Sequence, residues 1–282
     1  MFSKIELRSK KVLITGGAQG LGKSLAREFL NRGAELLVCD LNVAALQNLK
    51  DEFAVEFSND KLLTFKADVT NEQDLHKLKD FWLEKWGAID ILVNNAGIVY
   101  GGPFLEVPLE NHLKIFEVNL LGLIRVTHLF LPELLKSKEA CLLQIGSVTG
   151  LIGLAYGSTY ASSKWGVLGF SESIRQELRA TKHKNLHICV VCPSYIDTGM
   201  FEGSGAPLLM PFLKPDLLAR KIIRAVESKT FFVKEPFLVK TAALLRAALP
   251  IKIQDWVFDF LGVADGMKDW KGHCQKKDRV AS

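Results

Sequence analysis

The sequence predicts an α/β protein built on a doubly wound parallel sheet of about seven strands. Short runs that are apolar throughout alternate with segments of helical periodicity along the chain. Strands without polar alternation are typical of a sheet that helices cover on both faces. The 282 residues, 48% of them hydrophobic and 24% charged, have ordinary globular composition and a length at which α/β chains commonly form one domain.

The expected strands are short runs rich in apolar residues. Strands that alternate with helices run parallel and are joined by right-handed crossovers. A ligand then binds beyond the carboxyl ends of the strands, so the residues that follow each strand should line one crevice. In chain order the strands are Lys11–Thr15, Glu35–Cys39, Lys61–Lys66, Ile89–Val93, Ala140–Gly146, Leu186–Cys192 and, more weakly, Thr230–Lys234.

The expected helices are the amphipathic segments between these strands. In chain order they are Leu21–Arg32, Val43–Phe57, Glu72–Trp86, Leu109–Leu135, Tyr160–Ala180 and Pro215–Ser228. We expect residues 1–235 to form the Rossmann-type domain and residues 236–282 to form a helical extension packed on it. Residues 236–263 carry many apolar side chains, interleaved with Lys240, Arg246 and Lys252. Because a strong basic cluster is lacking, packing on the pocket or on a second copy is favoured over membrane contact.

Charge and segment composition exclude several protein classes. The balance of 36 Lys+Arg against 31 Asp+Glu gives a net charge of +5 without a run of like charges, so no nucleic-acid partner is expected. Met1–Arg8 lacks the apolar core of a secretory signal. The longest charge-free stretch, Ala140–Ser163, is interrupted by glycines and hydroxyl residues, so no spanning helix is expected there. We therefore expect a cytoplasmic protein.

The five cysteines, an odd and scattered set, suit a reducing compartment. Cys189 and Cys192 form a C-x-x-C, but they fall within an expected buried strand, where residues three apart face opposite sides. We expect them to pack in the core, and we predict no metal site.

A glycine-rich loop follows the first strand and opens the first helix. Glycines in this context let the backbone approach a phosphate at the positive end of a helix. Gly17-x4-Gly22-Lys23-Ser24 fits the P-loop of nucleotide triphosphatases, whereas Thr15-Gly16-x3-Gly20-x-Gly22 fits a dinucleotide loop. Leu25 stands where a strict G-x-G-x-x-G would place its third glycine. The loop alone leaves both interpretations open.

Two acidic residues follow the next two strands. Asp40 ends the second strand, where a carboxylate accepts hydrogen bonds from the adenosine ribose and repels a 2′-phosphate. No arginine stands beside it or in the glycine loop, which favours NAD over NADP. In the P-loop interpretation Asp40 could be a Walker B aspartate, although no water-positioning residue accompanies it. Asp68, after the third strand, could meet the adenine or simply cap a turn.

Several further motifs occur in a recognisable order. Asn94–Gly97 follows the fourth strand, Asn119 lies in the next helix, Ser147 follows the fifth strand, and Tyr160–Lys164 reads Y-A-S-S-K. With the glycine loop, these motifs make residues 8–235 resemble the short-chain dehydrogenase/reductase superfamily. The tail resembles its retinol dehydrogenase and 17β-hydroxysteroid dehydrogenase-like branch. The resemblance implies the strand order 3-2-1-4-5-6-7 and a homodimer or homotetramer.

The residue types explain the expected chemistry. Tyr160 and Lys164 stand four residues apart, so both project from one helix face. A free tyrosine has a pKa near 10, and a neighbouring ammonium should lower that pKa toward neutrality. Tyr160 then acts as general acid or base, and Ser147 binds the same substrate oxygen. The resemblance implies that Lys164 also holds the nicotinamide ribose and that Asn119 anchors a water in a proton relay.

The resemblance also implies a set of cofactor-binding residues. One departure from the family pattern is Pro193-Ser194, where Pro-Gly is usual, which leaves the path of that loop open. The implied set is Gly16, Gln19, Gly20, Leu21, Gly22, Asp40, Asp68, Val69, Asn95, Ala96, Gly97, Tyr160, Lys164, Pro193, Ile196 and Thr198.

The segment at about 195–215 is the expected substrate lid. It is apolar with glycine hinges, which suits a hydrophobic alcohol or ketone, although ordinary loop packing would look the same. The sequence therefore predicts an NAD-dependent oxidoreductase that interconverts a lipophilic alcohol and the corresponding carbonyl compound. The alternatives are an NADP-linked carbonyl or acyl-chain reductase, a non-catalytic nucleotide-sensing protein and a P-loop phosphotransferase.

Overall fold

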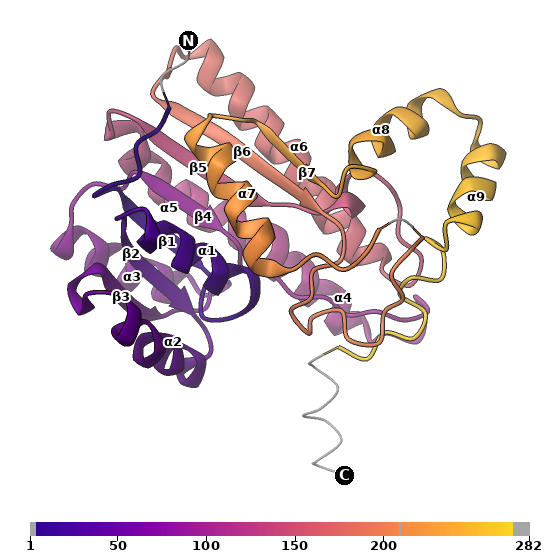
Figure 1. Cartoon of the computed structure of the whole chain (residues 1–282), viewed down its shortest axis with the longest axis horizontal. Coiled ribbons are helices and arrows are strands. Elements are labelled where there is room, and N and C mark those ends of the chain that lie inside the picture. The colour runs from indigo at the N-terminus through magenta and orange to yellow at the C-terminus, as the bar shows by residue number, and fades with distance from the viewer. Residues whose placement is uncertain (1–3, 209, 273–282) are drawn as a thin grey trace.

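The computed structural model describes residues 4–208 and 210–272 and contains one seven-stranded parallel sheet (Figure 1). Its order, β3-β2-β1-β4-β5-β6-β7, confirms the predicted order. The strands are β1 (Lys11–Thr15), β2 (Glu35–Asp40), β3 (Leu62–Lys66), β4 (Ile91–Asn94), β5 (Ala140–Ile145), β6 (Leu186–Pro193) and β7 (Phe232–Glu235).

Helices cover both faces of the sheet, as the unbroken apolar strands predict. Buried side chains of α1, α2 and α7 pack with strand residues in one core cluster, and those of α3, α5 and α6 pack with strand residues in the other. The α-helices are α1 (Gly20–Asn31), α2 (Val43–Glu56), α3 (Glu72–Lys85), α4 (Leu109–Phe116), α5 (Leu123–Lys136), α6 (Ser158–Ala180), α7 (Pro215–Glu227), α8 (Val239–Ala248) and α9 (Ile251–Phe260). Short turns η1 (Asn59–Lys61) and η3 (Val148–Gly150) are 3₁₀, whereas η2 (Glu117–Gly122) is a π-helical turn.

The expected helix Leu109–Leu135 contains an irregularity that its periodicity did not predict. The π-helical turn Glu117–Gly122 separates α4 from α5 and carries Asn119. Such turns insert an extra residue and are frequent at functional sites. By length and composition alone the run Leu109–Lys136 could cross a membrane, but 44% of its most apolar window is buried, and Val126, Phe130 and Leu134 pack against the sheet.

The free cysteines of the described residues are Cys39, Cys141, Cys189 and Cys192, and all four are buried. Burial raises the pKa of both Cys189 and Cys192 to about 12, so their thiols remain protonated and packed in the core. This confirms the predicted core role of the C-x-x-C pair. The fifth cysteine, Cys274, lies outside the described residues.

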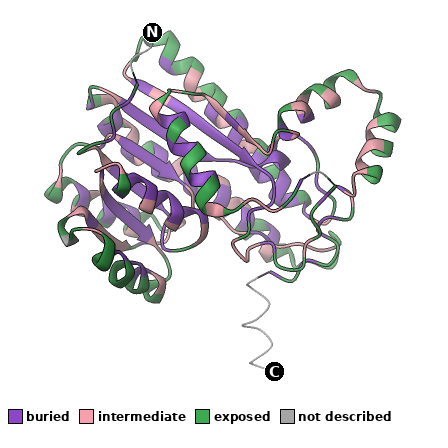
Figure 2. Ribbon diagram, viewed as in Figure 1, coloured by how far each residue is buried: buried purple, intermediate pink, exposed green. Residues whose placement is uncertain are grey.

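The C-terminal extension contains both packed and exposed parts. Val239 and Ala242 of α8 are buried in the core, whereas α9 has no buried residue (Figure 2). Figure 1 shows α8 and α9 projecting from one side of the molecule. Beyond α9 the chain returns to the body, where Met267 and Trp270 are buried against the loops after β4 and β6. The last part of the predicted extension, 273–282, lies outside the described residues.

Candidate active site

The glycine loop packs so closely on the loop after β4 that two of its glycines admit no side chain. Gly16 has φ +59°, and a Cβ there would lie 2.7 Å from the Ala96 Cα. A Cβ on Gly22 would lie 2.5 Å from the Gly16 carbonyl oxygen. The Asn95 side-chain amide donates to the Thr15 and Gly16 carbonyls at 3.1 and 2.6 Å, which fixes the turn. The loop therefore presents bare backbone, as close approach to a phosphate requires.

The start of α1 fits a dinucleotide. Its N-cap residue Gln19 makes no side-chain capping bond, so the capping side chain does not occupy the N-terminal N–H groups that a phosphate would need. A Cβ on Gly20 would lie 3.2 Å from the Thr198 side chain, so the glycine loop and the loop after β6 enclose the crevice between them. Leu21 is buried against the core.

The P-loop interpretation does not fit the side chains. The Lys23 ammonium forms an ion pair with Glu52, and the Ser24 hydroxyl donates to Asp216 at 2.6 Å. These two residues would have to reach the β- and γ-phosphates and Mg²⁺ in a P-loop. Both are instead directed toward neighbouring helices.

Asp40 lies at the end of β2 beside the glycine loop. One carboxylate oxygen accepts from the Ala18 N–H at 3.1 Å and the other from the Asn42 N–H at 3.0 Å. These bonds hold the carboxylate at the crevice, with lone pairs still open to ribose hydroxyls. No ion pair to Asp40 occurs among the charged groups of residues 4–208 and 210–272.

The other crevice residues follow β3 and β4. Asp68 accepts hydrogen bonds from the Thr70 N–H and hydroxyl at 2.8 and 2.7 Å. Its side chain therefore caps the local turn, which was one of the two roles expected from the sequence. Val69 is buried against Gly122. Gly97 lies between Asn119 and Lys164, since a Cβ there would be 3.4 Å from the Asn119 amide oxygen and 3.8 Å from the Lys164 Nζ.

Asn119 joins the π-helical turn to the loop after β4. Its amide oxygen accepts from the Ile98 N–H at 2.8 Å, and its nitrogen donates to the Ile98 carbonyl at 2.9 Å and to the Ser163 hydroxyl at 3.2 Å. Asn119 is 1% exposed. The observed role of its side chain is therefore to fix the backbone beside Lys164.

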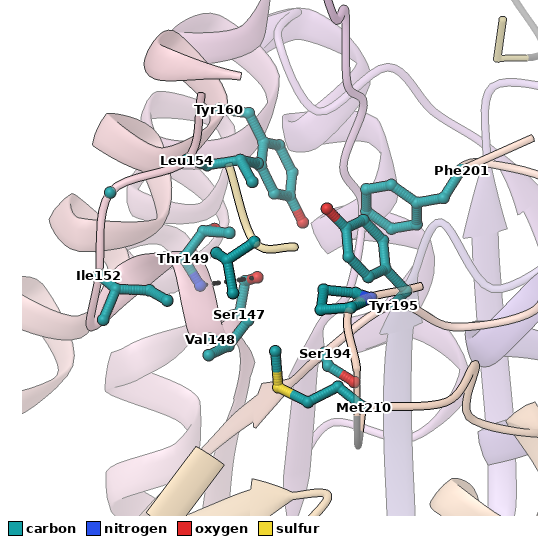
Figure 3. Close-up of a pocket in the computed structure, with 13 residues that line it drawn as sticks. Ser147, Val148, Thr149, Ile152, Leu154, Tyr160, Ser194, Tyr195, Phe201 and Met210 are labelled. Atoms are coloured by element: carbon teal, nitrogen blue, oxygen red, sulfur yellow. Dashed lines mark hydrogen bonds between the residues drawn. The ribbon is translucent and has the colours of Figure 1, made fainter. Parts of the chain in front are cut away.

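The candidate catalytic residues Tyr160 and Lys164 lie on α6, near Ser147, which is the N-cap residue of η3. Lys164 is buried, and its ammonium donates to the Ile145 carbonyl at 2.8 Å, while it lies 5.7 Å from the centre of the Tyr160 ring. Ser147 caps η3 by accepting from the Thr149 N–H at 3.2 Å. Tyr160 and Ser147 both line the same pocket (Figure 3).

The sequence predicts that Lys164 lowers the pKa of Tyr160, and here the structure differs. Burial raises the pKa of Tyr160 to about 12, an effect that the hydrogen bond from Ser147 only partly offsets. Burial also lowers the pKa of Lys164 to about 8. Desolvation disfavours the charged form of both groups, and it outweighs the attraction that the i, i+4 spacing suggests.

The pocket beside Tyr160 is mostly apolar, and the loop between β6 and α7 supplies part of its wall. Its apolar lining includes Val148, Ile152, Leu154, Phe201, Met210 and Val263. The space open to the centre of a water molecule is about 20 Å³, little more than one water needs. A larger substrate therefore does not fit the pocket in this conformation.

Backbone hydrogen bonds hold the loop after β6 in place, although Pro193-Ser194 stands where the family usually has Pro-Gly. The Ser194 N–H donates to the Glu235 carbonyl at 2.9 Å, and Ile196 bridges Leu213 across the base of the lid. The Thr198 N–H donates to the Ile196 carbonyl at 2.9 Å. Pro193 ends β6, so these residues lie at the carboxyl edge of the sheet.

Sequence reasoning missed the hydrogen bonds that join the loop after β6 to the C-terminal segment. The Trp270 indole donates to the Met200 carbonyl at 3.0 Å, and the Lys271 and Gly205 N–H groups bond to Glu202 and Gly266 carbonyls. Thr15 was named as the first residue of the glycine-loop motif, but not for its hydroxyl, which accepts from the Asn95 and Ala96 N–H groups after β4. These contacts join segments far apart in the sequence, so no local pattern could reveal them.

Known proteins share the sequence pattern and the fold. The sequence pattern of short chain dehydrogenases matches residues 10–207. Epidermal retinol dehydrogenase 2 of Mus musculus is 34% identical over 94% of this chain and 86% of its own length. Retinol dehydrogenase 10 of Homo sapiens is 30% identical over 89% of this chain and 81% of its own.

Two solved structures have similar folds. A short chain dehydrogenase/reductase from Burkholderia phymatum, in complex with NAD, has a TM-score of 0.78 and 23% identity, over 89% of this chain and 96% of that one. An alcohol dehydrogenase from Thermococcus sibiricus, complexed with 5-hydroxy-NADP, has a TM-score of 0.69 and 27% identity, over 79% of this chain and 93% of that one. Taken with the match over residues 10–207 and the retinol dehydrogenase relatives, these likenesses show that the chain belongs to the short-chain dehydrogenase family, in its retinol dehydrogenase-like branch, and is an oxidoreductase acting on CH–OH groups.

Proposed function

We propose that the protein uses NAD to oxidise a lipophilic alcohol, or NADH to reduce the matching carbonyl compound. The observation that carries this proposal is the buried pair of hydroxyls on Tyr160 and Ser147 at the wall of an apolar pocket. The pocket lies at the carboxyl edge of the sheet, where the glycine loop also lies. An apolar pocket with a few placed hydroxyls selects a hydrophobic molecule and orients one oxygen of it.

In the proposed mechanism the chain's own residues position the substrate and move one proton. Tyr160 gives its phenolic proton to the carbonyl oxygen in reduction and takes it back in oxidation. Ser147 hydrogen-bonds the same oxygen. Lys164, with Asn119 and Gly97 beside it, would hold the nicotinamide ribose, and the glycine loop and Asp40 would hold the pyrophosphate and adenosine ribose. When bound, the dinucleotide supplies hydride exchange with the substrate carbon.

The choice of NAD rests on Asp40, whose carboxylate lies beside the glycine loop. Among the described charged groups, none forms an ion pair with it. Titrating the protein with NADH or NADPH while following energy transfer from its tryptophans to bound nicotinamide, and with ATP while following tryptophan fluorescence itself, tests this choice. We expect tighter binding of NADH than of NADPH. Tighter NADPH would leave the enzyme class intact but point to the NADP-linked reductase, and a response to ATP with Mg²⁺ alone would restore the P-loop interpretation.

The pKa directions predict how the rate depends on pH. Tyr160 stays protonated below a pKa of about 12, so it is a competent acid for reduction throughout the neutral range. Lys164 loses its charge as pH rises through about 8. We expect kcat/KM for reduction to be flat below pH 8 and to fall above it, while kcat/KM for oxidation rises with pH because Tyr160 must be deprotonated.

Initial rates in both directions between pH 6 and pH 10 check this prediction. Lys164→Arg is the control, because arginine keeps its charge over this whole range. The fall in the reduction rate should disappear in this variant. A reduction rate that rises with pH in the unmodified enzyme would contradict the assignment.

A cytoplasmic location and a homodimer or homotetramer remain proposals. The exposed side chains Ile253, Trp256 and Phe260 of α9 are a candidate contact surface, because exposed apolar patches commonly mark interaction sites. Light scattering on a size-exclusion column gives the assembly size. If α9 mediates assembly, replacing these three residues with serine should reduce the measured mass to that of one chain, and an unchanged dimer or tetramer would place the interface elsewhere.

A further inference from the structure

The substrate pocket contains more buried hydroxyl groups than the proposed reaction uses. Among the described residues, six buried side-chain polar atoms have no hydrogen-bond partner in the protein. Three of them belong to residues that line this one pocket: Thr149, Ser194 and Tyr195. Leaving a hydroxyl unpaired in an apolar wall is unfavourable, so three such hydroxyls in one small pocket call for a role.

Tyr195 is the best placed of the three. It is 8% exposed, and Figure 3 shows its hydroxyl directed to the same side of the pocket as that of Tyr160. Phe201 packs edge-on against both rings, with centroids 6.1 Å from Tyr160 and 5.1 Å from Tyr195. Two tyrosine hydroxyls therefore face one apolar space.

The C-terminal segment confines the Tyr195 hydroxyl. A Cβ on Gly266 would lie 2.7 Å from that oxygen, which is closer than a real contact allows. Only glycine at position 266 therefore leaves room for the Tyr195 hydroxyl. The Gly266 carbonyl in turn accepts from the Gly205 N–H of the lid at 2.9 Å. The hydroxyl is thus held at the pocket wall by segments after β6 and after α9. Burial raises the pKa of Tyr195 to about 12, so it remains a neutral donor and acceptor near pH 7.

We infer that Tyr195 binds a second oxygen of the substrate, close to the carbon that reacts at Tyr160. This inference rests on the proposed function, because it assigns the reacting oxygen to Tyr160 and Ser147. The preferred substrate is then a lipophile with two neighbouring oxygens, such as a vicinal diol or a hydroxyketone, rather than a simple alcohol. A hydrogen bond formed in so apolar a space discriminates well, since a substrate that lacks the second oxygen leaves the hydroxyl unpaired.

A binding experiment tests this without turnover. The protein is saturated with whichever reduced nicotinamide cofactor binds it more tightly, and is titrated with decan-1-ol, decane-1,2-diol or decane-1,10-diol while cofactor fluorescence is followed. An alcohol cannot react with the reduced cofactor, so only affinity is measured. We expect the 1,2-diol to bind about tenfold more tightly than decan-1-ol, because one neutral hydrogen bond changes the affinity by about that factor. The 1,10-diol, whose second oxygen is remote, should bind no more tightly than decan-1-ol.

The variant Tyr195→Phe keeps the ring and removes the hydroxyl. We expect it to bring the affinity ratio of 1,2-diol to decan-1-ol close to one, while Tyr156→Phe, a nearby tyrosine outside the pocket lining, keeps the ratio of the unmodified protein. Thermal unfolding confirms that both variants are folded.

Three results would overturn the inference: equal binding of decan-1-ol and the 1,2-diol, a ratio unaffected by Tyr195→Phe, or binding of none of the three compounds. A separate turnover assay with the same alcohols and NAD or NADP tests the proposed function. An intact affinity ratio without turnover of these alcohols, or of retinoid and steroid alcohols, would retain the second-oxygen subsite and reject the oxidation proposed above.

Discussion

Replacing Tyr160 with phenylalanine should lower kcat by about a thousandfold or more in either direction. The variant removes only the phenolic oxygen, so the ring keeps its edge-on packing with Phe201. General acid–base catalysis by a placed side chain commonly contributes a factor of about 10² to 10⁴, and the buried Tyr160 proton would have no substitute in the apolar pocket. Steady-state kinetics with a lipophilic alcohol measures the loss.

Cofactor affinity separates catalysis from folding in this variant. Because the glycine loop and Asp40 are remote from the phenol, the Kd for NADH should change by no more than about twofold. Tyr156→Phe, which alters a neighbouring tyrosine without a lysine four residues later, should leave kcat unchanged. Retained turnover in Tyr160→Phe would contradict the proposed role, whatever the fold.

Replacing Asp40 with alanine should weaken NAD use by about ten- to a hundredfold and narrow the preference for NAD over NADP. Hydrogen bonds to a charged group contribute about 1.5–3 kcal/mol, and the same charge repels a 2′-phosphate. The ratio of kcat/KM for the two cofactors is the quantity to measure. An unchanged ratio would mean that the ribose is recognised elsewhere.

Asp40→Ala also removes the acceptors of the Ala18 and Asn42 N–H groups, so a change in loop structure must be distinguished from a change in charge. Asp40→Asn supplies this control, because the amide oxygen can still accept one of those hydrogen bonds while the charge is gone. If repulsion sets the preference, both variants should use NADP better than the unmodified protein. If only alanine changes the ratio, loop structure is the cause.

Local sequence patterns predicted the sheet well because each strand is buried on both faces. Val12–Ile14 and Leu36–Cys39 are wholly apolar, so neither could be mistaken for a loop or a half-exposed strand. The end of β4 was less certain, since polar residues follow it at once: the strand runs from Ile91 to Asn94 rather than from Ile89 to Val93. Element ends depend on tertiary hydrogen bonds that composition does not encode.

The candidate site was predictable where the chemistry is local and unpredictable where it depends on burial. Tyr160 and Lys164 follow from their spacing on a helix. The raised pKa of Tyr160 does not, because desolvation depends on the lid and on Phe201, which lies 41 residues later. The same holds for Tyr195, whose unpaired hydroxyl becomes visible only when the segment around Gly266 is placed against it.

The most direct test of the proposed reaction is the transfer of a labelled hydride. The protein is incubated with NAD and decane-1,2-diol or decan-1-ol carrying deuterium on carbon 1, and the recovered cofactor is analysed by mass spectrometry. The proposal predicts deuterated NADH with the unmodified protein and at least about a thousandfold less with Tyr160→Phe. NADH that forms without deuterium would place the reaction at another carbon. If NADH failed to form from these and from retinoid or steroid alcohols, with binding intact, oxidation of lipophilic alcohols would be contradicted.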